Sequence, residues 1–261
     1  NNFNDIFAAL TISKSLPKNT GTVIVKHANP CGVSSDKNHL KSYKLALNCD
    51  PISAFGGIVS CNFKVKKNLA LELSKIFLEV VIGIGFEKDA IKILKRKKNL
   101  RIIDASNITL KNVDSFVSNS DYILNQTSDT DIFSNKNFKV VSKKKPSRKI
   151  YNDLIFAFNV CRFVKSNAIV IAKNLSTVGI GSGQPSRLDS CNIAINKMKQ
   201  LQKINNDCVA ASDAFFPFVD GIEKLVQSGI CAVIQPSGSI KDKDIINFAN
   251  KTGTVLIFSK T

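Results

Sequence analysis

The amino-acid sequence predicts an α/β fold built from layers of helices and strands. Short runs of apolar and β-branched residues at 22–25, 57–61 and 79–84 alternate with helical patterns at 40–47 and 66–76. Regular alternation of strand and helix is the pattern of layered α/β domains. The length of 261 residues is enough for one large domain or two small ones with proper cores.

The first half continues with another helical pattern and then changes character. Residues 88–97 predict a helix with Ile91 and Leu94 on its inward face. Residues 106–145 are rich in Asn, Ser, Asp and Lys, and contain only short strand-like pieces such as 122–124. We interpret this stretch as a connection between two subdomains.

A second α/β unit follows the connection. Pro146 and Ser147 open a long helix with an apolar stripe made by Ile150, Leu154, Phe158, Cys161 and Val164. The strands at 168–172 and 177–180 are joined by a short turn, which predicts an antiparallel pair. The remaining expected elements are helix 186–203, strand 208–211, helix 217–228 with Gly229 as its C-cap glycine, strand 231–235, helix 242–251 and strand 254–258.

The net charge of +17 allows three interpretations. A basic surplus is typical of proteins that bind nucleic acid, a membrane surface or anionic substrates, but also of a merely lysine-rich surface. Lysines are scattered in short clusters such as 95–98 and 143–145, and no basic helix carries interleaved aromatics. We therefore expect no nucleic-acid partner. The longest apolar runs have only the length of a strand, so no membrane partner is expected either.

The seven cysteines indicate a reducing compartment. Their number is odd and no Cys-x-x-Cys pair occurs, which favours free thiols in the cytoplasm over a disulfide framework. The chain has no secretory signal and begins at Asn1 without an initiator methionine. We interpret it as a fragment of a longer protein.

The segment KHANPCG at 26–32 is the first candidate for chemistry. Lys26 supplies a fixed positive charge, and His27 supplies a group that titrates near neutral pH. Acyl transfer to an amine needs both, since one group moves the proton and the other stabilises an oxyanion. The alternative is a histidine satisfied by backbone carbonyls. A zinc site or a Cys–His nucleophile pair with Cys31 is a weaker alternative, because no third ligand or Cys-x-x-Cys partner follows.

Three further segments combine glycine, proline and polar residues at the ends of apolar runs. DPISAFGG at 50–57 predicts a tight loop whose amides and aromatic ring could face a planar ligand. GIGSGQPSR at 179–187 opens a helix where Arg187 could hold an anion, but it matches neither the dinucleotide fingerprint nor a Walker A loop. SDAFFPFVD at 212–220 could form a slot for a flat heterocycle. The alternatives are an ordinary turn, a solvated arginine and core phenylalanines.

Together these segments resemble the 5-aminoimidazole-4-carboxamide ribonucleotide (AICAR) formyltransferase domain of the bifunctional purine biosynthesis family. The matching stretches are NNFND, VKHANPCGV, DPISAFGGIVS, VKSNAIVIAK, GIGSGQPSR, ASDAFFPF, DGIEKLVQSGI and AVIQPSGSIKD. The resemblance implies two cytidine-deaminase-like three-layer α/β/α subdomains without zinc. We expect the first at 1–140, including the connecting region, and a C-terminally truncated second at 141–261. We expect the family's upstream IMP cyclohydrolase domain to be absent from this chain.

The resemblance also implies a reaction and partners. The formyl group of 10-formyltetrahydrofolate, the cosubstrate, would pass to the 5-amino group of AICAR ribonucleotide during de novo IMP synthesis. The longer protein would also have IMP cyclohydrolase activity. We expect small-molecule substrates, a homodimer with shared active sites and a cytoplasmic location, and the resemblance adds a structural potassium ion as a candidate.

The family's site residues fall on defined positions of this sequence. By resemblance, His27 would shuttle the proton and Lys26 would polarise the formyl oxygen and orient the substrate. The expected substrate contacts are Asn4, Phe55, Gly56, Glu79, Asn167 and Phe215. The expected folate contacts are Arg187, Pro217, Asp220, Ser237 and Gly238, with Phe215 also facing the folate. Phe7 and Val219 depart from the family pattern, and the family's motifs before Asn1 and beyond Thr261 would lie outside this sequence.

Overall fold

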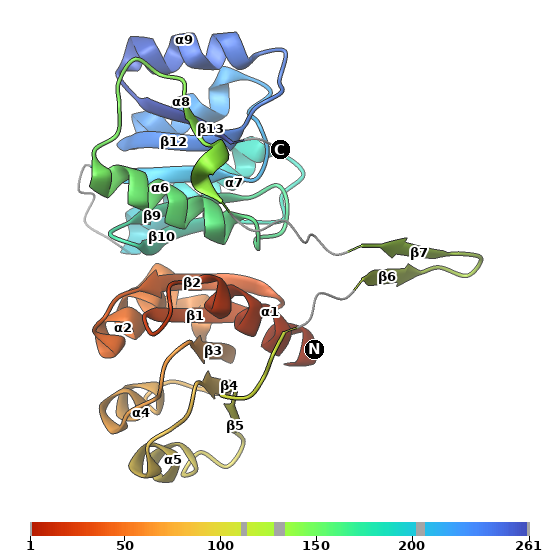
Figure 1. The fold of residues 1–261 in the computed structure, drawn as a ribbon, viewed down its shortest axis with the longest axis vertical. Coiled ribbons are helices and arrows are strands. Elements are labelled where there is room, and N and C mark those ends of the chain that lie inside the picture. The colour runs from red at the N-terminus through yellow and green to blue at the C-terminus, as the bar shows by residue number, and fades with distance from the viewer. Residues whose placement is uncertain (1, 111–113, 128–133, 202–206, 260–261) are drawn as a thin grey trace.

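The computed structural model describes residues 2–110, 114–127, 134–201 and 207–259 (Figure 1). The first half runs α1 (Asn2–Ser15), β1 (Gly21–Lys26), β2 (Asn29–Ser35), α2 (His39–Cys49), α3 (Pro51–Ala54), β3 (Gly57–Cys61), α4 (Lys67–Leu73), β4 (Leu78–Gly83), α5 (Lys88–Leu94) and β5 (Arg101–Asp104). The connection holds β6 (Ser115–Ser118), β7 (Ile123–Gln126), the 3-10 turn η1 (Asn135–Asn137) and β8 (Lys139–Val140). The second half runs α6 (Arg148–Cys161), β9 (Ile169–Lys173), β10 (Ser176–Gly181), α7 (Arg187–Leu201), β11 (Cys208–Ser212), α8 (Val219–Gln227), β12 (Ile230–Pro236), α9 (Asp242–Thr252) and β13 (Val255–Ser259).

The two halves repeat one order of elements and share one sheet. Apart from the short α3, each half reads helix, hairpin, helix and then three strands connected by helices. The strands form an 11-stranded mixed sheet in the order β5-β4-β3-β1-β2-β10-β9-β11-β12-β13-β8. The central pairs are antiparallel, and the pairs β3–β4, β4–β5, β11–β12 and β12–β13 are parallel. The predicted α/β fold is therefore confirmed.

Helices cover both faces of the sheet. On one face α1 and α6 pack on a hydrophobic core that continues across both halves (Figure 1). On the other face each half has its own core, under α2, α4 and α5 in the first and under α7, α8 and α9 in the second. Within the described residues, no helix combines the length and the apolar composition needed to cross a bilayer.

The halves meet at an antiparallel seam between β2 and β10. Ser34 pairs with Ser176, and the amide of Ser35 donates to the carbonyl of Leu175 at 2.9 Å. Thr177 extends the seam through its side chain, because its Oγ1 accepts from the amide of Val33 at 2.9 Å and donates to the carbonyl of Val33 at 3.2 Å. The seam is buried, so these hydrogen bonds satisfy backbone groups that water cannot reach.

Each hairpin turn is held by an aspartate from the first helix of its own half. The Asp5 carboxylate accepts from the amides of His27 and Ala28 at 2.9 and 2.7 Å. In the second half, the Asp153 carboxylate accepts from the amides of Asn174 and Leu175 at 3.0 and 2.7 Å. All four turn residues have positive φ, between 51° and 59°, which is the geometry of a two-residue hairpin turn.

The structure differs from the sequence-based expectations at β2. Asn29-Pro30-Cys31-Gly32 has the composition of a loop, but it begins a strand because β1 pairs with it across the hairpin. β10 pairs with β2 only further along, at Ser34. The short strand β5 and helix α3 were also not expected. The predicted antiparallel pair β9–β10 is confirmed, and Gly229 follows α8 with a φ of 92°. Residues 202 and 203 of the predicted helix 186–203, and parts of the connecting region, lie outside the described residues.

The two turn-holding aspartates should contribute unequally to stability. Asp153 is 1% exposed, whereas Asp5 is half-buried, so water can replace only the latter. We expect Asp153→Ala to lower the free energy of unfolding by about 2–4 kcal/mol, because two amides lose their acceptor away from water. Asp5→Ala should cost only about 1 kcal/mol. Urea denaturation of the two variants tests this, and equal losses would contradict it.

Candidate active site

Most of the sequence-predicted site residues gather along one edge of the sheet. The strand register brings together the β1–β2 turn, the starts of β3 and β4, the end of β10 and the ends of β11 and β12. The start of α1 lies at the same edge, because Asp5 holds the β1–β2 turn. We call this the site edge. It collects segments that are up to about 230 positions apart, from Asn4 to Gly238.

Lys26 and His27 lie at the β1–β2 turn. The imidazole of His27 is exposed, and its backbone is fixed by Asp5. The Lys26 Nζ donates to the carbonyl oxygen of Phe55 at 2.7 Å. This bond uses one of three ammonium protons and does not neutralise the charge. Within the described part of the chain, no carboxylate forms an ion pair with Lys26.

Phe55 and Gly56 form the wall beside Lys26. The rings of Phe55 and Phe77 have centroids 5.4 Å apart, and the amide of Gly56 donates to the carbonyl of Phe77 at 2.9 Å. Gly56 has a φ of 72°, and a Cβ there would lie 3.9 Å from the Lys26 Nζ. The positive φ favours glycine at this turn. The predicted pair Phe55 and Gly56 therefore touches Lys26 directly.

A cavity of about 490 Å³ opens beside the turn, between the two halves. Its lining residues are Lys26, His27, Asn29, Pro30, Cys31, Asp50, Ser53, Ile180, Ser182, Gln184, Ile193 and Lys197. Lys197 from α7 forms an ion pair with Asp50, which caps α3. Burial would raise the pKa of Asp50, but hydrogen bonds from Lys197 and Ser53 outweigh it and hold the pKa below its usual value. The Asp50 carboxylate is thus ionised at neutral pH and pairs with Lys197, whereas Lys26 has no carboxylate partner among the described residues.

Cys31 is not suited to act as a nucleophile. Burial, reinforced by the negative charge of Asp50, raises the pKa of its thiol from 9.0 to about 12. At neutral pH the thiol therefore stays protonated, and the thiolate is the reactive form. The structure thereby disfavours the Cys–His pair that the sequence left open.

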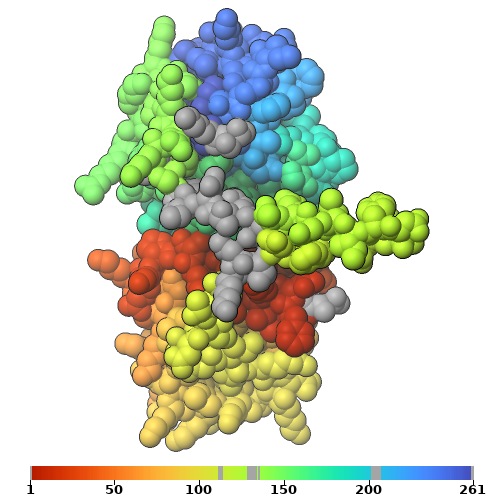
Figure 2. Space-filling model, turned by 45° about the vertical axis from the view of Figure 1, so that its right-hand side comes forward, coloured from red at the N-terminus to blue at the C-terminus, as the bar shows by residue number. Residues whose placement is uncertain are grey.

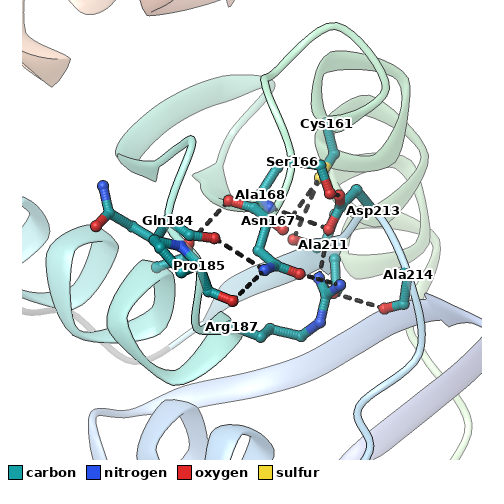
Figure 3. A network of polar contacts seen from close by, with 12 residues as sticks. Cys161, Ser166, Asn167, Ala168, Gln184, Pro185, Arg187, Ala211, Asp213 and Ala214 are labelled. Carbon is teal, nitrogen blue, oxygen red and sulfur yellow. Dashed lines mark hydrogen bonds and ion pairs between the residues drawn. The ribbon is translucent and has the colours of Figure 1, made fainter.

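A second cluster surrounds Arg187 at the start of α7 (Figure 3). The guanidinium donates to Ser212 Oγ at 2.8 Å, to Asn167 Oδ1 at 2.6 Å and to the Asp213 carboxylate, with which it forms an ion pair. The Asn167 Nδ2 donates to the carbonyls of Gln184 and Pro185 at 2.8 and 3.0 Å. The side chain of Asn167 is thereby fixed, and one acceptor lone pair of its Oδ1 remains for a ligand.

Asp213 holds this cluster together. Its carboxylate also accepts from Ser166 Oγ and from the amide of Ala168. Burial would raise its pKa, but the hydrogen bonds from Ser166, Ala168 and Arg187 lower it below the usual value. Asp213 therefore neutralises the charge of Arg187. Arg187 positions Asn167 and does not offer a free positive charge to an anion.

A cavity of about 500 Å³ lies beside the second cluster. Its lining residues are Asn167, Pro185, Ser186, Arg187, Leu188, Ala214, Phe215, Phe216, Pro217, Phe218, Asp220 and Gly221. The sequence allowed the three phenylalanines to be either core residues or the wall of a binding slot. Phe216 is buried in the core, whereas Phe215 and Phe218 are exposed at the cavity. Aromatic faces with one carboxylate nearby suit a flat, polar heterocycle.

Six predicted site residues lie at or near the site edge but line neither cavity. Two of them are Phe55 and Gly56 beside Lys26, and the other four are Asn4, Glu79, Ser237 and Gly238. Asn4 is exposed on α1. Glu79 forms an ion pair with Arg101 at 3.0 Å. Ser237 and Gly238 follow β12, where their amides donate to Ser259 and Asp242.

Sequence reasoning missed the residues that hold the site together. Asp5, Lys197 and Asp213 each fix a predicted site residue or complete a cavity wall, and Gln184 lies at both clusters. Asp213 stands in the stretch ASDAFFPF, but nothing in the sequence marks it as the partner of Arg187. The described residues contain no group of three or more His, Cys, Asp or Glu placed to hold a metal ion. The potassium ion stays a prediction.

Comparison with known proteins places the chain among enzymes of one family. The model of the family described as the AICARFT/IMPCHase bienzyme matches residues 1–197. The chain is 44% identical over 266 residues to the bifunctional purine biosynthesis protein PurH of Persephonella marina, covering 99% of this chain and 50% of that protein. It is 43% identical to PurH of Aquifex aeolicus and 44% identical to PurH of Buchnera aphidicola, again over half of each. The chain thus spans about half the length of the relatives it matches.

The raised pKa of Cys31 predicts low reactivity. At pH 8 we expect iodoacetamide to alkylate Cys31 in the folded protein at least about 100-fold more slowly than a free thiol, because so little thiolate is present. The rate should increase with pH until the pH reaches about 12. Peptide mass spectrometry of timed samples measures this, with the urea-unfolded chain as the reactive control. Fast alkylation of Cys31 in the folded chain would contradict the expectation.

Proposed function

Because the chain belongs to the AICARFT/IMPCHase bienzyme family, we propose that it transfers the formyl group of 10-formyltetrahydrofolate to the 5-amino group of AICAR ribonucleotide. The product is the formamido ribonucleotide of IMP synthesis. The observation that carries this proposal is the β1–β2 turn, where Lys26 has no carboxylate partner among the described residues and the exposed His27 stands next to it.

The reaction needs one proton acceptor and one oxyanion partner. The amine nitrogen of the ribonucleotide attacks the formyl carbon, and the carbonyl oxygen becomes negative in the tetrahedral intermediate. His27 accepts the proton that the amine loses and returns it to N10 of the folate when the carbon–nitrogen bond of the donor breaks. Formyl group and proton both change carriers, so the atoms balance and tetrahydrofolate leaves.

Lys26 is suited to the oxyanion. Its ammonium is held by the Phe55 carbonyl, which leaves two of its protons for the developing negative oxygen. A preorganised cation stabilises charge that appears only in the transition state, and this lowers the barrier instead of tightening substrate binding. The neighbouring Lys197 is neutralised by Asp50 and is therefore a weaker candidate for this role.

We assign the two clusters of the site edge to the two substrates. We assign the cavity lined by Phe215, Pro217 and Asp220 to the heterocycle of the folate. We assign the wall of Phe55, Gly56 and the β1–β2 turn to the ribonucleotide, with Asn4 and Glu79 at its margin. Ser237 and Gly238 would meet a more distant part of the folate. Arg187 takes part by fixing Asn167.

The remaining family properties are proposed with the reaction. Each half would be a cytidine-deaminase-like subdomain, divided near residue 140, and the repeated order of elements supports this. Two copies would associate and share active sites, which the separation of the site residues into two clusters supports. A longer protein would add IMP cyclohydrolase activity. The odd number of cysteines and the resemblance both support a cytoplasmic location. The resemblance is the sole support for a structural potassium ion.

The two histidines of the chain provide a matched test. His27→Ala should lower formyl transfer at least about 1,000-fold and leave ribonucleotide binding within about threefold, because the proton acceptor is lost but the walls remain. His39 stacks on the buried Phe63 with ring centroids 3.7 Å apart, near the opposite edge of the sheet. His39→Ala should keep activity within about fivefold. Tetrahydrofolate release and calorimetric binding of the ribonucleotide are the two measurements.

The assay should use this chain beside a version extended at both termini. Activity in the extended version, with loss only in His27→Ala, supports the proposal. Turnover at the wild-type rate in His27→Ala would show that His27 is not the proton shuttle. Two folded but inactive wild-type versions would reject the proposed reaction. Salt-dependent binding of both to a nucleic-acid duplex would then favour the basic-surface interpretation of the sequence.

A further inference from the structure

A groove lies at the edge of the sheet opposite the site edge, where α1 ends and α6 begins (Figure 1). Two adjoining cavities of about 520 and 740 Å³ form it, and both are lined by Pro17, Ser35, Asn152 and Leu175. The space-filling view shows the first residues of the chain, in red, at the boundary between the two halves (Figure 2). We call the two cavities together the α6 groove. It shares no lining residue with the cavities of the site edge.

The smaller cavity has an apolar wall and one unsatisfied polar atom. Leu16, Ile155 and Phe156 supply the wall. Asn159 also lines this cavity and is only 6% exposed. Its Nδ2 donates to the carbonyl oxygen and to the Oγ of Ser15 at 3.3 and 3.1 Å, whereas its Oδ1 has no hydrogen-bond partner among the described residues. A buried acceptor without a donor costs free energy, so a ligand that brings an N–H group to this atom gains affinity.

The α6 groove is strongly basic. Six basic and two acidic residues line it, and the basic ones are Lys14, Lys18, Lys37, Lys41, Arg148 and Lys149. Both acidic residues already have partners. Asp36 forms an ion pair with Lys41 at 2.7 Å, and the buried Asp153 accepts from the two turn amides. In the part of the chain that the structure describes, Lys41 is the one basic residue of the six in an ion pair. The groove therefore has a surplus of positive charge.

Two helices begin at the larger cavity with basic residues. Arg148 and Lys149 open α6, Lys41 lies in the first turn of α2, and neither first turn contains an acidic residue. A helix N-terminus carries a partial positive charge, which favours acidic side chains and disfavours basic ones. The basic residues therefore add to the positive potential of both helix dipoles. An anion bound in the groove would relieve this repulsion.

The two cavities together suit a ligand with two parts. The apolar wall suits a flat ring that carries an N–H donor for Asn159 Oδ1. The basic cavity suits a group with several negative charges, and phosphate oxygens form strong, charge-assisted hydrogen bonds with lysine and arginine. One molecule can span both cavities, because they share four lining residues.

We propose that the α6 groove binds a nucleoside polyphosphate, with the base in the smaller cavity and the phosphates in the larger one. The base donates to Asn159 Oδ1, and the phosphates lie between the starts of α6 and α2. This site is separate from the site edge, and the inference does not depend on the proposed reaction.

The first test separates the two parts of the ligand by calorimetric titration with ATP, tripolyphosphate and adenosine. ATP should bind to this chain and to a version extended at both termini. Tripolyphosphate and adenosine should each bind at least about tenfold more weakly than ATP, because each fills one cavity only. Tripolyphosphate that binds as tightly as ATP would overturn the base site. Absence of ATP binding would overturn the whole proposal.

The second test uses variants with a matched control. Arg148→Gln combined with Lys149→Gln should raise the dissociation constant of ATP at least about tenfold, because charged donors to the phosphates are lost. Lys95→Gln combined with Arg96→Gln removes the same charges from exposed residues at the end of α5, and should keep that constant within about twofold. Equal effects of the two double variants would overturn the assigned location. Asn159→Leu should reduce the preference for ATP over tripolyphosphate, and an unchanged preference would overturn the role of Asn159.

The third test locates the ligand on the wild-type chain, so it does not depend on the folding of any variant. Photolabelling with 2-azido-ATP should modify peptides that contain Leu16 or Ile155, which line the smaller cavity. Labelling confined to peptides that contain Phe55 or Phe215 would place the nucleotide at the site edge and overturn the proposal. Formyl transfer, or its absence, bears only on the proposed reaction.

Discussion

The antiparallel seam between β2 and β10 is the constraint on which the site depends. Two similar halves could join in many ways, but this seam continues one sheet through both. Because it is antiparallel, the end of β10 lies beside the start of β2, and the loop before α7 therefore reaches the β1–β2 turn. Thr177 secures the register with a side chain where the backbone ladder is short. A parallel junction would place the two clusters at opposite edges.

The repeat extends to single hydrogen bonds. Ser42 Oγ donates to the carbonyl of Thr20 at 2.9 Å, and Ser190 Oγ donates to the carbonyl of Asn167 at 2.8 Å. A Cβ on Gly32 would overlap the carbonyl of Ala46 in α2, and a Cβ on Gly179 would overlap that of Ala194 in α7. Helix and hairpin approach so closely that only glycine fits at either position. The chemistry-bearing residues differ between the halves, whereas the residues that set this spacing do not.

Much of the fold could be predicted from the sequence, and the failures have physical causes. The short turn between β9 and β10 and the periodic helices are local patterns, and local patterns can be read from one sequence. β2 was missed because Asn29-Pro30 has turn composition and becomes a strand only through its neighbours. Within the site, Lys26 and His27 could be proposed from their chemistry. The ion pair between Lys197 and Asp50, however, joins residues 147 positions apart, and no local sequence pattern predicts such a contact.

The two aspartates that hold the hairpin turns, Asp5 and Asp153, differ in how far water can reach them. Asp153, which holds the turn of Asn174 and Leu175, is buried, so its carboxylate is a stable acceptor for the two turn amides. Asp5, which holds the turn of His27 and Ala28, is only half-buried. The amide hydrogens of His27 and Ala28 should therefore exchange with deuterium through local opening of the turn, without unfolding of the sheet. The site edge is thus the more mobile edge of the sheet, and the opposite edge is the more rigid one. Substitutions at the site edge can therefore change specificity without weakening the hydrogen bonds of Asp153 at the opposite edge.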